Sequence, residues 1–191
     1  MRRLRPVDLF LHPTEVHVVT AADGSRWATD RYIVVRLDHP VSTVLDGLAG
    51  LDDGVWEIRA LRPPARRGDT TIPLERVFDG WECVQTVYPS RWVLLDGHSE
   101  QIQRRPLVTS PHGDEVAAVV DGHLWRALTR ANPYPAEVWA EYRQSGQHAG
   151  AGVVRVMVAP PEGGPYVLAY LMTVAMGCTV TLPTVPEGVL G

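Results

Sequence analysis

Hydrophobic and polar residues alternate with a period of two along much of this chain, a pattern typical of strands that are buried on one side. Residues 23–38 show it clearly, because Ile33 and Leu37 fall on one side of the chain and Tyr32 falls on the other. This stretch predicts two short strands joined through residues 28–31. The same alternation, or a short apolar run, predicts further strands at residues 55–61, 115–120, 153–159 and 166–174.

Three other stretches have the apolar spacing of an amphipathic helix. Residues 41–51 place apolar side chains on one face, and Gly47 predicts that this helix is short and held by packing. Residues 123–131 follow Asp121, a residue type that caps helices, and residues 136–143 show a similar pattern. The sequence therefore predicts an α+β fold of mostly antiparallel, curved sheets with two or three short helices on one face.

The order of these elements predicts a weak internal repeat, since a strand, a short helix and further strands occur twice. We expect one half at residues 1–95, a second half at residues 96–176 and a C-terminal tail at residues 177–191. The stretch at residues 62–69 is rich in proline and arginine, which predicts a surface loop.

Composition excludes several classes of function. The chain of 191 residues has a net charge of -4, and all 18 of its basic residues are arginine. Without lysine there is no P-loop lysine, no Schiff base and no serine–lysine dyad. Cys83 and Cys178 are too few for a disulfide framework, and no run approaches the roughly 18 apolar residues of a membrane span. The basic start lacks the apolar run of a secretory signal, so we expect a cytoplasmic protein.

Catalytic motifs are absent from the sequence: it contains no G-x-S-x-G, no G-x-G-x-x-G and no H-E-x-x-H. His12, Glu15 and His17 are close in sequence, which raises the question of a metal site. On a strand, however, His12 and Glu15 face opposite sides, and no further cluster of ligands follows. We therefore expect no metal, no cofactor and no enzymatic activity; a hydrolase with an unassigned site is the least supported alternative.

Three short segments stand out in order along the chain: WATDRYIVVRL (residues 27–37), TVYPSRWVLL (residues 86–95) and YLMTVAM (residues 170–176). They resemble three segments of the bacterial DNA polymerase III sliding clamp (β subunit) family, in the same order. These are the A-T-D-G-H-R-L segment, the phenylalanine-proline-aspartate-tyrosine segment that closes the middle domain, and the C-terminal Y-V-V-M-P-M-R-L strand. The resemblance covers residues 26–176 at low identity.

This resemblance implies a DNA-clamp-like fold with a pocket that receives a short peptide from polymerases, the clamp loader and repair proteins. Aliphatic and thioether side chains would accept the leucine and phenylalanine of such a peptide. The implied protein is processivity-factor-like, binds DNA polymerase or another clamp-binding replication protein, and forms a homo-oligomer. Carried over residue by residue, the pocket consists of Thr29, Arg31, Tyr32, Val34, Pro89, Leu94, Tyr170, Met172 and Val174.

The sequence also departs from the family. The glycine, histidine and arginine of the family motif are Arg31, Tyr32 and Ile33 here, and the chain is shorter than the three domains of a clamp. The alternative is a small phage-type interaction protein that binds or sequesters a host replication partner without encircling DNA. In clamps, short helices face the duplex, which implies that Arg126 and Arg130 contact the phosphates of double-stranded DNA. A solvated arginine face is the other interpretation of this pair.

The N-terminal residues 5–11 (RPVDLFL) resemble the peptide that clamp partners insert, which has a polar residue, an aliphatic one, then Asp or Ser, Leu and Phe. Our favoured prediction is a strand that directs Leu9 and Leu11 to the core. The alternative is that Val7, Leu9 and Phe10 fill a clamp pocket, either in this protein or in a host clamp.

Overall fold

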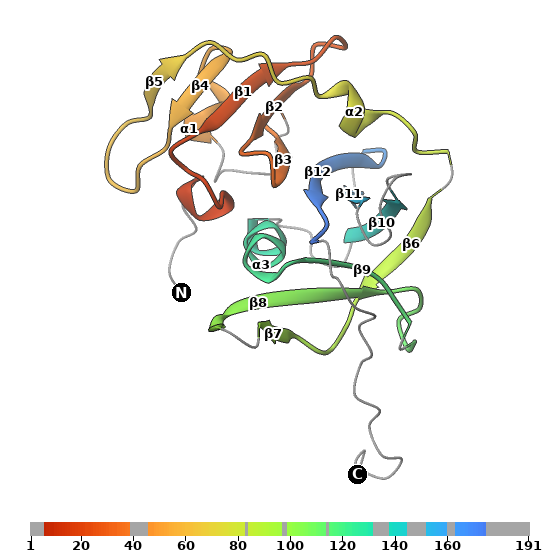
Figure 1. The fold of residues 1–191 in the computed structure, drawn as a ribbon. Coiled ribbons are helices and arrows are strands. Elements are labelled where there is room, and N and C mark those ends of the chain that lie inside the picture. Colours follow the sequence, from red (N-terminus) through yellow and green to blue (C-terminus); the bar gives the residue numbers. More distant parts are fainter. Residues whose placement is uncertain are drawn as a thin grey trace.

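The structure is a computed structural model that describes residues 6–38, 46–82, 84–96, 99–113, 115–131, 138–144, 152–159 and 163–174. Antiparallel strands dominate these residues, and short helices connect them (Figure 1). The helices are η1, a 3-10 helix (Pro6–Leu9), α1 (Asp46–Ala49), α2 (Glu75–Phe78) and α3 (Gly122–Ala131). The strands are β1 (Val16–Thr20), β2 (Arg26–Thr29), β3 (Ile33–Arg36), β4 (Gly54–Glu57), β5 (Ala65–Gly68), β6 (Gln85–Pro89), β7 (Leu94–Asp96), β8 (Ser99–Val108), β9 (Val116–Asp121), β10 (Val138–Gln144), β11 (Gly152–Val158) and β12 (Tyr166–Met172).

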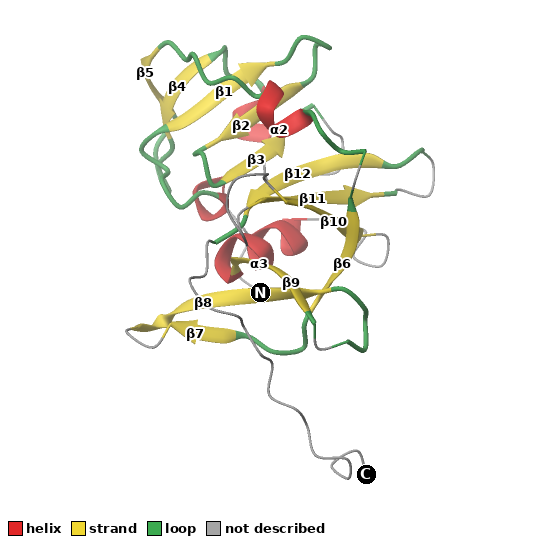
Figure 2. Ribbon diagram, turned by 45° about the vertical axis from the view of Figure 1, so that its right-hand side comes forward, coloured by secondary structure: helices red, strands yellow, loops and turns green. Residues whose placement is uncertain are grey.

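The strands form one continuous sheet in the order β5-β4-β1-β2-β3-β12-β11-β10-β6-β8-β7, with β9 on the other edge of β8. A bridge between Val120 and Thr173 joins the end of β12 to β9, and the N–H of Val174 donates to the carbonyl oxygen of Val119 at 2.7 Å. Strands β12, β11, β10, β6, β8 and β9 therefore close into a ring. Figure 2 shows α3 between the β10–β11–β12 side and the β8–β9 side of this ring.

Helix α3 forms where the sequence predicts it. The Asp121 carboxylate accepts the backbone N–H groups of His123 at 2.8 Å and Leu124 at 3.1 Å, so the predicted cap is confirmed. Leu124 and Leu128 are buried in the main core, which the apolar side of the curved sheet encloses. Because the helix buries one face and exposes the other, its apolar spacing was sufficient to predict it.

A second, smaller core lies on the opposite face of the sheet. It contains Trp27, Val34, Leu74, Val153 and Tyr170, and α2 packs beside it. The fold is thus α+β and mostly antiparallel, as predicted. Helices α1 and α3 contribute to the main core, but α2 lies on the other face, so the prediction that all helices share one face is wrong.

The N-terminal segment forms η1 and not a strand. Leu9 is fully buried and Phe10 is 4% exposed, both within the main core. The ring of His123 on α3 contacts the carbonyl oxygen of Asp8 at 2.9 Å, which places η1 beside α3. Because this chain buries Leu9 and Phe10 itself, neither side chain is free to enter the pocket of a clamp.

Two further local predictions are corrected. The helix predicted at residues 136–143 is not formed where the structure describes it: residues 138–143 belong to β10, which pairs with β6 on one side and β11 on the other. Residues 136 and 137 lie outside the described residues. Ala140 and Tyr142 are buried from this strand, so a period of two, and not 3.6, describes its burial. Part of the predicted loop at 62–69 forms β5, which pairs with β4.

The expected boundary after residue 95 falls inside β7, and strands on both sides of it pair, for example Val35 with Ala169. The helix prediction for residues 41–45 and the tail at 177–191 lie outside the described residues. Among the residues that the structure describes, no helix is long and apolar enough to cross a membrane.

Candidate functional site

A buried carboxylate organises the connection between β2 and β3. Asp30 is 3% exposed, and its side-chain oxygens accept four backbone N–H groups. Oδ2 accepts those of Leu11 at 2.6 Å and His12 at 2.9 Å, and Oδ1 accepts those of Tyr32 at 3.0 Å and Ile33 at 3.1 Å. Four donors match the acceptor sites of one carboxylate. Asp30 therefore fixes the chain that leaves η1 against the β2–β3 turn.

Arg31 occupies a backbone conformation that favours glycine, with φ of 76°. A non-glycine residue there costs about 1–2 kcal/mol. The Arg31 guanidinium donates to Glu15 at 2.9 Å, but the two side chains are 65% and 54% exposed, and such surface pairs contribute about 0–1 kcal/mol. The ion pair does not offset the backbone cost, so stability alone does not explain an arginine at this position.

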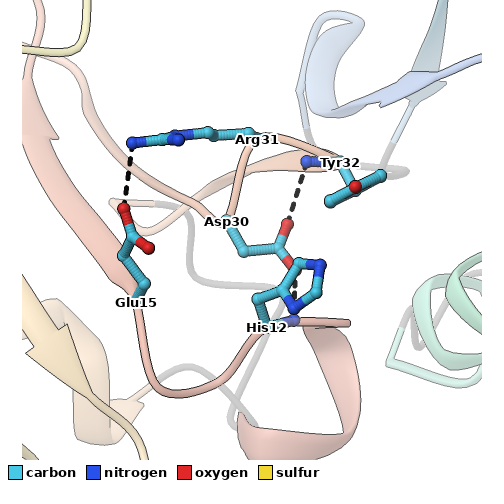
Figure 3. Close-up of a pocket in the computed structure, with 5 residues that line it drawn as sticks. All are labelled: His12, Glu15, Asp30, Arg31 and Tyr32. Atoms are coloured by element: carbon cyan, nitrogen blue, oxygen red, sulfur yellow. Dashed lines mark hydrogen bonds and ion pairs between the residues drawn. The ribbon is translucent and has the colours of Figure 1, made fainter.

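Arg31 and its neighbours line a polar cavity of about 470 Å³ (Figure 3). Arg31 and Glu15 form one wall, Asp30 lies between the walls, and the rings of His12 and Tyr32 form the other at a centroid distance of 5.1 Å. Tyr32 is 46% exposed. The cavity thus offers a cationic donor, an anionic acceptor and aromatic surface to a polar ligand group. Within the described part of the chain, no three His, Cys, Asp or Glu side chains gather as metal ligands.

His17 lies behind this wall in β1 and is 5% exposed. Its Nδ1 is 2.9 Å from the hydroxyl of Thr70, and its Nε2 is 3.5 Å from Glu15. Burial lowers the pKa of His17, and the positive charge of Arg31 acts in the same direction, whereas Glu15 partly raises it. His17 is therefore a neutral, buried polar group at neutral pH.

The structure brings together the first and third segments that resemble the clamp. Val34 in β3 and Tyr170 in β12 are directly paired across adjacent strands, and the N–H of Met172 donates to the carbonyl oxygen of Tyr32 at 2.9 Å. Thr29 pairs with Val34 on the other side. Thr29, Val34 and Tyr170 are buried, however, and Met172 is half-buried. They form an interior face and not an open groove.

The second segment lies elsewhere in the sheet. Pro89 ends β6 and Leu94 begins β7, and β10 and β11 lie between β6 and β12. Val174 is at the junction with β9, where its N–H donates to Val119. Pro89 lines a separate apolar cavity of about 170 Å³, whose other lining residues are Val87, Tyr88, Trp125, Thr129, Trp139 and Ala140. The residues predicted to form one peptide pocket therefore lie in more than one part of the sheet.

The predicted DNA-binding residues lie on the solvent side of α3. Arg126 and Arg130 are both exposed and are one turn apart. Arg126 donates a hydrogen bond to the side-chain oxygen of Gln103 on β8. Burial lowers the pKa of Arg105 on β8, and the positive charge of Arg126 lowers it further.

The sequence indicated a polar turn in which Asp30 bonds nearby backbone groups, as it does with the amides of Tyr32 and Ile33. It gave no sign of the bonds from the amides of Leu11 and His12. It also gave no role to residues 69–82, although two aromatic residues, Phe78 and Trp81, occur there within an acidic stretch. No protein-family model, curated protein or solved structure matches this chain.

Proposed function

We propose that this chain is a sliding-clamp-like accessory protein of DNA replication, which holds a short peptide of a DNA polymerase or of another replication protein and catalyses no reaction. The observation that carries the proposal is the direct pairing of Val34 with Tyr170. These residues belong to the two segments that resemble the strands of the clamp's peptide pocket, and they are far apart in the sequence.

The conformation of Arg31 supports the same proposal. Arg31 stands where the A-T-D-G-H-R-L segment has its glycine, and its φ of 76° is a value that glycine adopts without strain. A turn of this shape at this position is what the resemblance implies. Tyr32 follows at the exposed rim, next to the polar cavity, where it can contact a bound peptide.

Contact with double-stranded DNA is a second proposed function, and the exposed pair Arg126 and Arg130 favours it. Encirclement of DNA would need several copies of so short a chain. Among the described strands, β5 and β7 end the sheet and each pairs on one side only, so both edges are free to bind another copy. The alternative of an interaction protein that sequesters a replication partner predicts a monomer.

The test is fluorescence anisotropy with a labelled peptide of sequence Gln-Leu-Asp-Leu-Phe. We expect a dissociation constant near the micromolar range and a loss of about tenfold with Tyr32→Ala, since one aromatic contact is worth about 1–2 kcal/mol. Leu61→Ala is the control, because Leu61 is 92% exposed and lies on a distant loop. Absence of binding up to about 1 mM, or an equal loss in both variants, would contradict the proposal.

A further inference from the structure

A segment of the chain itself covers the face on which Val34 and Tyr170 lie. Residues 69–82, here called the strap, contain α2 and pass over the sheet face opposite α3 (Figures 1 and 2). Leu74 of the strap is 3% exposed and belongs to the second core together with Trp27, Val34 and Tyr170.

Aromatic contacts continue this packing along the strap. The ring of Phe78 is 5.0 Å from that of Trp27 and 5.4 Å from that of Tyr170, and the ring of Trp81 is 5.6 Å from that of Tyr170. The strap thus presents an aliphatic side chain and, four positions later, an aromatic one to the face that the resemblance assigns to a partner's leucine and phenylalanine.

The backbone of the strap is only weakly attached to the sheet. Helix α2 has four residues, none of them buried, and no side chain caps its N-terminus. So short a helix has no stability of its own. Within the described residues, no backbone hydrogen bond joins the strap to a strand. The attachment consists of side-chain packing and of a few polar contacts. Near the start of the strap, the Thr70 hydroxyl is 2.9 Å from Nδ1 of His17 in β1, and Asp69 pairs with Arg66 of β5 at 2.7 Å. Near its end, Arg143 donates to the carbonyl oxygens of Arg76, at 3.0 Å, and Asp79.

Arginine side chains of the sheet lie against the strap, which is itself acidic. The guanidinium groups of Arg143 and Arg155 lie 5.2 Å and 4.3 Å from the ring of Trp81. The strap carries exposed carboxylates at Glu75, Asp79 and Glu82. A ligand of this face therefore combines apolar anchors with acidic neighbours.

We propose that the strap is an intramolecular ligand that a partner peptide of the same chemistry displaces: aliphatic and aromatic anchor residues next to acidic ones. This deepens the proposed function and rests on it only for the identity of the partner. A tethered segment competes at an effective concentration in the millimolar range, so the free face is a minor state and the apparent affinity for a partner is reduced accordingly.

The experiment uses a labelled synthetic peptide of residues 70–82 as the probe and measures its anisotropy with three full-length proteins. The wild type should bind it weakly, because its own strap occupies the face. Arg143→Gln removes the two bonds to the strap carbonyls and should bind about fivefold more tightly. Leu74→Ala with Phe78→Ala removes two of the strap's apolar anchors from the face and should bind about tenfold more tightly or better.

Arg91→Gln is the matched control, because Arg91 also lies over a tryptophan ring, that of Trp92 at 5.3 Å, but away from the strap. It should bind like the wild type. Equal affinities of all proteins for the peptide would overturn the proposal. So would the absence of binding to the Leu74→Ala, Phe78→Ala variant when circular dichroism shows that this variant is folded. If the double variant does not fold, the peptide affinity of Arg143→Gln alone tests the proposal, because this substitution removes no residue of either core.

Hydrogen exchange gives a second, independent measurement. The amides of Val77 and Phe78, which bond to the carbonyl oxygen of Leu74, should exchange much faster than those of the β3–β12 pair. Equal protection would show that the strap does not open and would overturn the proposal. Binding of the strap peptide without binding of Gln-Leu-Asp-Leu-Phe would refute the proposed replication partner and leave the strap inference intact.

Discussion

The carboxylate of Asp30 accepts the backbone N–H of Leu11 at 2.6 Å across a separation of 19 residues. This bond and its neighbour to His12 hold the N-terminal segment at the position where Leu9 and Phe10 enter the main core. One polar side chain in a turn thus determines where a hydrophobic segment packs.

Asp30→Asn should therefore be strongly destabilising. An amide side chain offers one oxygen, and its NH2 group would face two of the four backbone donors, so buried N–H groups would lose their acceptor. We expect the free energy of unfolding to fall by about 3 kcal/mol, measured by urea denaturation. Asp53→Asn is the control, since Asp53 is exposed and its carboxylate accepts bonds only from Thr20 among the described residues, and it should cost less than about 1 kcal/mol. Similar costs for both variants would show that Asp30 is not the central acceptor.

The backbone conformation of Arg31 predicts an inverted order of substitutions. At most positions alanine is more stable than glycine, but at a φ of 76° glycine should be more stable than alanine by about 1 kcal/mol. Thermal unfolding of Arg31→Gly and Arg31→Ala measures this difference. The peptide affinity of both variants should fall alike if the guanidinium contacts the ligand. The usual order, with alanine more stable, would show that the turn has another conformation.

The strands were predictable where one local pattern determined the outcome. The two strands of residues 23–38 appear as β2 and β3 because alternation and a polar turn suffice to specify a hairpin. Helix α3 appears because Asp121 caps it and one face is apolar. A helix was predicted at residues 136–143. The described part of that stretch belongs to β10, because β6 and β11 supply hydrogen bonds on both edges.

The site was less predictable for a physical reason. The hydrogen-bond partners of Asp30 include backbone amides, which no side-chain pattern reveals. Val34 and Tyr170 face the strap because of the order of strands in the sheet and because α2 packs on the second face. The periodicity of apolar residues along the chain indicates neither the strand order nor the place of α2. The first and third of the segments that resemble the clamp lie on paired strands, and nothing in these segments indicates that the chain's own Leu74 and Phe78 cover them.

His17 should make stability depend on pH. Burial lowers its pKa in the folded protein below the ordinary value of 6.5, so the unfolded chain binds a proton at a pH where the folded protein does not. The stability that neutral His17 contributes to the folded protein is fully present above about pH 6.5. It decreases as the pH falls from there through the pKa of His17 in the folded protein. His17→Gln should flatten the dependence of unfolding free energy on pH between about pH 7 and 5. An unaltered slope in His17→Gln would refute this assignment.

The exposed pair Arg126 and Arg130 on α3 predicts how strongly DNA binding depends on salt concentration. Each phosphate that the protein neutralises contributes about −0.9 to the slope of log K against log salt concentration. Arg126→Glu with Arg130→Glu should therefore weaken binding to duplex DNA and reduce that slope by about 1.8. The charge-matched control is Arg62→Glu with Arg91→Glu, two exposed arginines outside α3, which changes net charge equally. Loss of binding in the α3 variant alone would locate the contact on this helix. Equal loss in both variants would indicate a general effect of net charge, and an unchanged slope in both would mean that α3 does not touch DNA.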